Sequence, residues 1–95
     1  MSFSNTFETR VLTWVFTTGT ATRPTEWHIA LYTGAPSDPG GGTEVSGGSY
    51  ARKSMAAMTV SGTSPTTATN GAAVEFATAT GSWGTVTHVG VFDAA

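Results

Sequence analysis

The segment Glu26–Arg52, EWHIALYTGAPSDPGGGTEVSGGSYAR, governs how the rest of the chain is interpreted. Residues 26–33 alternate strictly between two faces, as successive residues of a β-strand do. One face carries Trp27, Ile29 and Leu31, and the other carries His28, Ala30 and Tyr32. Aromatic and β-branched residues favour a strand here. We expect the face with Trp27 to be the core, because it holds the larger aliphatic side chains.

A glycine-rich loop at residues 38–48 follows this strand. Proline lacks the N–H that a ladder needs and glycine favours bent backbone, so the strand cannot continue through it. The loop is long for a hairpin connection. We therefore expect it to be dispensable for folding and to serve as a contact surface, together with the aromatic residues around it. The candidate interaction residues are Tyr32, Asp38, Gly40, Gly41, Gly42, Gly47, Gly48, Tyr50 and Trp83.

An amphipathic helix is predicted over residues 5–17, with Asn5 as its N-cap and Glu8 at the capping-box position. Phe7, Val11 and Trp14 recur at helical spacing on one side, and Trp14 is expected to be a core residue. An isolated helix of this length is only marginally stable in water. It must therefore dock, either on its own sheet or on a neighbouring molecule.

Further strands are predicted at residues 50–61, 72–78 and 83–92. Together with the first strand and the helix, they indicate one mainly β domain over 1–95, an antiparallel β-sandwich-like fold with an N-terminal helix. The last strand carries apolar residues on both faces, little charge and no proline. Such a strand favours pairing with another chain along an open edge, so we expect a homo-oligomer.

Composition excludes several classes of function. The 95 residues have a formal net charge of −2 and only 11% charged residues, so there is no basic surface for nucleic acid. There is no cysteine, hence no disulfide framework. No signal peptide and no apolar run of about 20 residues is visible, so we expect no membrane span and assembly in a host cytoplasm.

No pattern typical of catalysis or metal binding is present. A zinc site needs three or four suitably spaced ligands, and His28 and His88 are better explained as structural residues of strands. Glu26 and Asp93 could meet as an acid/base pair, but solvated surface acids are the more common case. The run at residues 40–42 lacks the Lys and the helix of a phosphate loop. We expect no enzyme activity, no cofactor and no metal.

Three segments carry a resemblance to a known family. They are WHIALYTGAPSD at 27–38, TEVSGGSYAR at 43–52 and WGTVTHVGVFDAA at 83–95. The chain resembles small structural proteins of tailed bacteriophages that are usually labelled tail fibre or tail proteins, and the similarity extends from the N-terminal helix to Ala95. The resemblance implies a virion component whose partners are other virion proteins.

Two kinds of function are compatible with these residues. The first is a tail or tail-fibre component acting through repetitive protein–protein assembly, with head decoration as a variant of the same role. The second is a carbohydrate-binding module that recognises a host-surface glycan. Tyr32 and Tyr50 flank the glycine loop, and Trp83 begins a predicted strand. Exposed aromatic rings in such places serve both sugar stacking and protein contacts.

Overall fold

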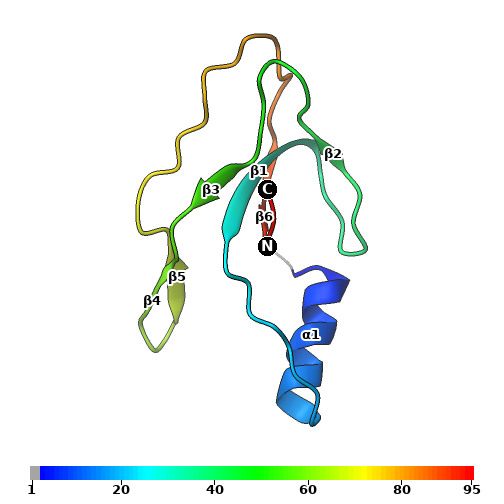
Figure 1. The fold of residues 1–95 in the computed structure, drawn as a ribbon, viewed down its shortest axis with the longest axis vertical. Coiled ribbons are helices and arrows are strands. Elements are labelled where there is room, and N and C mark those ends of the chain that lie inside the picture. The colour runs from blue at the N-terminus through cyan, green and yellow to red at the C-terminus, as the bar shows by residue number, and fades with distance from the viewer. Residues whose placement is uncertain (1–2) are drawn as a thin grey trace.

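The computed structural model describes residues 3–95, and strand β1, Trp27–Gly34, lies at the centre of its four-stranded antiparallel sheet (Figure 1). Along one edge, β1 pairs with β6, His88–Phe92. The other edge is shared by β3, Lys53–Met55, beside the first half of β1 and β2, Thr43–Glu44, beside the second half. β2, β3 and β6 therefore all form their backbone hydrogen bonds with β1.

Two elements lie apart from this sheet. Helix α1, Asn5–Phe16, precedes it, and strands β4, Thr59–Ser61, and β5, Thr67–Thr69, form a projecting hairpin (Figure 1). Within residues 3–95, no Cα atom of α1 or of the hairpin lies within 8 Å of a strand of the four-stranded sheet. The predicted class, a mainly β fold of antiparallel sheets with an N-terminal helix, is confirmed, and its sheets are not closed on one another.

The buried face of β1 is the opposite of the one expected. His28, Ala30 and Tyr32 are buried, whereas Trp27 and its two neighbours on the other face are only half-buried. Alternation distinguishes two faces, but the covering groups decide which one is the core. Here the covering group is the ring of Phe92, which stacks on Tyr32 at 6.2 Å between centroids. The same ring lies over Gly90, where a Cβ atom would come within 2.7 Å of it.

Three strand predictions need correction. The predicted strand at 72–78 is wrong, because Phe76 in this irregular segment packs its ring on Tyr50 instead of joining a ladder. The segment 50–61 contains two short strands that belong to different sheets, β3 and β4. In 83–92 only the part from His88 onward is strand, since Gly84 has φ +76° and bends the chain.

The helix matches its prediction closely at both ends. Its N-cap is Ser4, one residue before the expected Asn5, and the Ser4 hydroxyl accepts a hydrogen bond from the N–H of Phe7 at 3.2 Å. The expectation that Trp14 is a core residue is wrong, because this side chain is 64% exposed. Across residues 3–95, α1 included, no helix has the length and apolar character that a membrane crossing requires.

Candidate interaction surface

Residues 43–52 pack together with Trp83 around the ring of Tyr50, and we call this unit the clasp. The Tyr50 hydroxyl accepts a hydrogen bond from the N–H of Leu31 at 3.0 Å and donates one to the carboxylate of Glu44 at 2.9 Å. The edge of its ring meets Trp83 at 5.6 Å between centroids, and the indole N–H of Trp83 donates to the carbonyl of Gly48 at 3.0 Å. Tyr50 and Trp83 are therefore held against each other, half-buried, and tie this loop to the sheet.

Arg52 completes the clasp from the other side. Its guanidinium donates to both carboxylate oxygens of Glu44, at 2.9 and 3.1 Å, and lies 3.9 Å from the centroid of the Phe92 ring. It also donates to the carbonyl of Ala94 at 3.3 Å. The hydrogen bonds from Arg52 hold the pKa of Glu44 below its ordinary value of 4.5, because they stabilise the ionised carboxylate.

This ion pair predicts a specific loss of stability in acid. A carboxyl group whose pKa is lowered by folding stabilises the protein above its unfolded pKa, near 4.5, and the contribution disappears as the pH falls through the lower folded-state value. Urea unfolding between pH 7 and pH 3 should show this decline. The Glu44→Gln variant should be less stable at pH 7 and should lose part of the acid dependence. An unchanged pH profile in that variant would contradict the assignment.

The glycine loop thus divides into two parts with different roles. Val45 is buried, and its N–H donates to the carbonyl of Leu31, so residues 43–52 belong to the fold. The tip at residues 37–42 is exposed and is closed by hydrogen bonds between Ser37 and Gly40. The expectation that the whole loop 38–48 is dispensable for folding therefore applies, at most, to its tip.

Gly47 and Gly48 offer a matched pair for testing the clasp. Both have positive φ angles, +74° and +56°, but a Cβ atom at Gly48 would lie 2.9 Å from the indole nitrogen of Trp83, whereas one at Gly47 meets nothing within 4 Å. Gly47→Ala should cost about 1–2 kcal/mol, the usual cost of a left-handed residue. Gly48→Ala should cost clearly more and shift the tryptophan fluorescence. Equal unfolding free energies for the two variants would contradict the close packing of Trp83 on Gly48.

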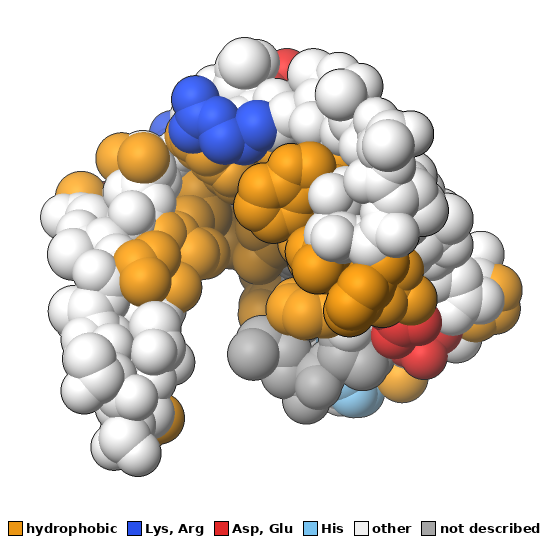
Figure 2. Space-filling model, turned by 90° about the horizontal axis from the view of Figure 1, so that it is seen from below, with side chains coloured by type: hydrophobic (Ala, Val, Ile, Leu, Met, Phe, Trp, Pro, Cys, Tyr) orange, Lys and Arg blue, Asp and Glu red, His pale blue; other side chains and the backbone are white. Residues whose placement is uncertain are grey.

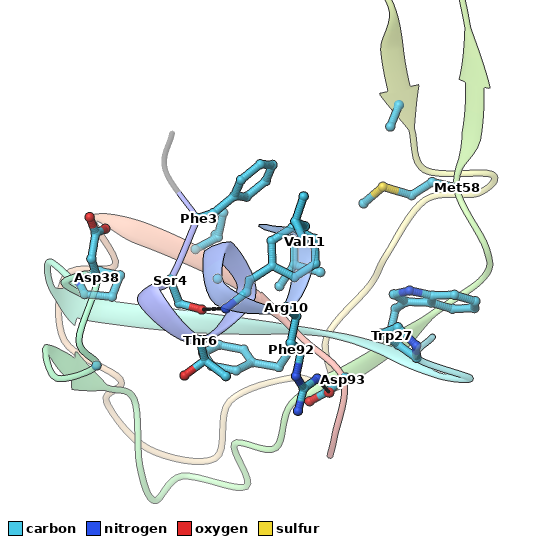
Figure 3. A pocket seen from close by; sticks show the side chains of 18 of the residues that line it. Phe3, Ser4, Thr6, Arg10, Val11, Trp27, Asp38, Met58, Phe92 and Asp93 are labelled. Carbon is cyan, nitrogen blue, oxygen red and sulfur yellow. Dashed lines mark hydrogen bonds and ion pairs between the residues drawn. The ribbon is translucent and has the colours of Figure 1, made fainter. Parts of the chain in front are cut away.

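A broad apolar groove lies between α1, β6 and the β4–β5 hairpin (Figures 2 and 3). Figure 2 shows hydrophobic side chains gathered around this hollow. The helix contributes Phe7, Val11 and Trp14, all exposed, and β6 contributes Val89 and Val91, which are 63% and 53% exposed. Exposed side chains of this size in one contiguous hollow are typical of a surface that another protein covers.

The sequence-predicted residues are only partly brought together here. Tyr32, Asp38, Gly40 and Gly41 line the groove, and the backbone carbonyl of Asp38 accepts a hydrogen bond from the N–H of Asn5 at 3.0 Å. The remaining candidates belong elsewhere: Gly42 in the loop tip, and Gly47, Gly48, Tyr50 and Trp83 in the clasp. The helix and β6 were not among the candidate interaction residues, although the helix was expected to dock on its own sheet or on a neighbouring molecule and the last strand to pair with another chain. The apolar residues on both faces of 83–92 were the signal for β6, and the apolar side of the helix was the signal for α1.

Charged groups are sparse in the groove. Arg10 and Asp93 form a half-exposed ion pair at 3.7 Å on one wall. Arg23 also lines the groove and has no side-chain partner in the part of the chain that the structure describes. Over residues 3–95, no group of three His, Cys, Asp or Glu side chains could hold a metal ion. The chemistry that this surface offers is therefore apolar contact, with a few charges that can select a partner.

The sequence matches one family model along residues 2–95, and that family is described as podophage GP4 fiber I protein gp80. The chain belongs to this phage fibre family. No curated protein and no solved structure gives a significant match. Membership confirms the resemblance to phage tail-fibre proteins. A protein of this fibre family is a virion component that associates with other components of the particle. The groove is a candidate surface for that association.

Proposed function

We propose that this fibre-family protein is a non-enzymatic structural subunit that covers its exposed apolar side chains by assembling with copies of itself through the groove. The observation that supports this most directly is its exposed area of 6919 Å². A compact protein of 9.7 kDa exposes roughly 5,100 Å². The excess of roughly 1,800 Å² exceeds the ~800 Å² that each partner buries in a standard interface.

The shape of the chain supports the same conclusion. Its radius of gyration is 15.3 Å, whereas a compact domain of this length has roughly 12 Å. The buried apolar residues are only Ala30, Tyr32, Val45 and Met55 in the described chain, and no large side chain there is fully buried. A core of this size supplies little stability to set against the conformational entropy of folding. Burial between subunits would supply the missing apolar contacts.

A glycan-binding role has less support. It depended on exposed aromatic faces around the glycine loop, but Tyr32 is buried and Tyr50 and Trp83 pack on each other. Their polar atoms are also engaged: the Tyr50 hydroxyl bonds Leu31 and Glu44, and the Trp83 indole bonds Gly48. No specific observation favours head decoration over a fibre role, and family membership favours the fibre.

Sedimentation velocity of the isolated protein over a wide concentration range tests the proposal. We expect a discrete oligomer that dissociates on dilution, with loss of helical signal as α1 loses its cover. Antibody labelling of purified particles should place the chain in the fibres, in multiple copies. A monomer at the highest concentration whose α1 amides are fully protected from hydrogen exchange would contradict the proposal.

A further inference from the structure

We propose that helix α1 of one copy lies in the apolar groove of the next copy, so that subunits join head to tail. This inference rests on the proposed self-assembly and names the element that fills the groove. Three independent features of the described chain support it: a second apolar face on the helix, the size of the groove, and one pair of complementary charges that have no partner within a single copy.

The helix carries two exposed apolar faces. The first, with Phe7, Val11 and Trp14, forms a wall of its own groove. The second comprises Leu12, Val15 and Phe16, which are 56%, 53% and 77% exposed and do not line that groove. At 100° per residue, this second face is centred well over 90° from the first. A helix that is apolar on two sides requires cover on two sides.

Cover on both faces requires two different contacts. If the second face enters the groove of a neighbour, it packs against that neighbour's first face and against β6. The first face of the helix is then covered by the helix of one neighbour, which lies in this copy's groove. The second face is covered by the groove of the other neighbour. A two-fold pairing that uses only one face of each helix would leave the other face in water. A heterologous contact of this kind closes into a ring or extends as a filament.

The volume of the groove is large enough for a helix to enter it. The hollow has a volume of about 1990 Å³. Helix α1 has 12 residues, so it is roughly 18 Å long and 10–12 Å wide, which corresponds to roughly 1,400–2,000 Å³. The walls seen in Figure 3, with Phe3 and Val11 on one side and Trp27 and Met58 on another, are apolar, as the second helix face requires.

The charges agree as well. Glu8 lies one turn before Leu12 and two turns before Val15, so its carboxylate belongs to the second helix face. Neither Glu8 nor the groove residue Arg23 has a side-chain partner within the described residues. Docking of α1 in a neighbour's groove would bring an acidic side chain to a groove that carries an unpaired guanidinium, and such complementarity sets the register of an interface.

Disulfide trapping tests the contact directly, because the chain contains no cysteine of its own. Leu12→Cys and Met58→Cys variants, distinguished by a tag on one of them, are mixed and mildly oxidised. Both positions are exposed, so the variants should fold normally, and far-UV circular dichroism checks this. We expect a mixed disulfide between the two variants as the main product. Glu75→Cys, exposed and away from the groove, is the matched control for Met58→Cys and should give little mixed product.

Charge exchange provides a second measurement. Glu8→Arg and Arg23→Glu should each weaken self-association in sedimentation, and the double variant should recover much of the loss. Glu75→Arg, a change of the same type outside the groove, should leave association unchanged.

The two experiments distinguish failure of the head-to-tail contact from failure of the proposed self-assembly. Oligomers in which the Leu12→Cys variant cross-links mainly to itself, or not at all to the Met58→Cys variant, overturn the head-to-tail inference and leave the proposed self-assembly standing. A chain that stays monomeric under all conditions overturns both.

Discussion

Replacing Tyr32 with alanine should lower the free energy of unfolding of the isolated protein by about 3–5 kcal/mol, the usual cost of removing a large buried aromatic side chain. Tyr32 is only 6% exposed, and its ring stacks on Phe92, which in turn carries the guanidinium of Arg52. The stability of a small domain is about 5–15 kcal/mol in total, so this loss would unfold a large part of the population. Urea denaturation followed by circular dichroism measures it.

Tyr32→Phe is the matched control. It keeps the stacked ring and removes a hydroxyl that has no hydrogen-bond partner among residues 3–95. We therefore expect a change in unfolding free energy within about 0.5 kcal/mol. If the alanine variant unfolded at the same urea concentration as the unaltered protein, the stack of Tyr32 and Phe92 would not be the centre of the core.

Replacing Trp14 with alanine should weaken self-association and leave the stability of the monomer nearly unchanged. The side chain is exposed in the single chain, so the unfolding free energy of the monomer should change by less than about 0.5 kcal/mol. In the assembly, Trp14 lines the occupied groove. Tryptophans at the centre of interfaces contribute about 2–4 kcal/mol. Self-association should therefore weaken by roughly 30- to 700-fold, measured by sedimentation.

Glu75→Ala serves as the control for Trp14→Ala, because Glu75 is exposed and does not line the groove. It should change neither stability nor association by much. A Trp14→Ala variant that unfolds early as a dilute monomer would show that the helix docks on its own sheet. One that associates normally would remove the helix from the interface.

The family resemblance and the local elements could be predicted from residues alone. Strict alternation over residues 26–33 predicted β1, and the spacing of Phe7, Val11 and Trp14 predicted α1 nearly to its ends. The mainly β class followed from the turn residues between the strands. Each of these inferences depends on neighbours within a few positions, where side-chain period and backbone preference act directly.

The roles of single residues were harder to predict, because they depend on which distant segments meet. The side chain of Phe76 looked like part of a strand, yet it packs on Tyr50, 26 positions earlier in the chain. Tyr50 and Trp83 were candidate contact residues, yet they hold the second half of the glycine loop to the sheet. The local sequence pattern shows that such residues are apolar, but it does not predict which distant residues they pack against.

Local patterns in the chain were enough to specify the main elements, their order and the apolar character of the helix and the last strand. Which apolar surfaces are covered within one chain depended instead on the tertiary arrangement. The antiparallel pairing of β6 with β1 places Phe92 over the Ala30 and Tyr32 face, so that face became the core. The helix found no strand to pack on within the described chain, so its apolar side chains stay in solvent. Burial depends on contacts between segments far apart in sequence, and those contacts leave this chain with its largest apolar surfaces facing outward.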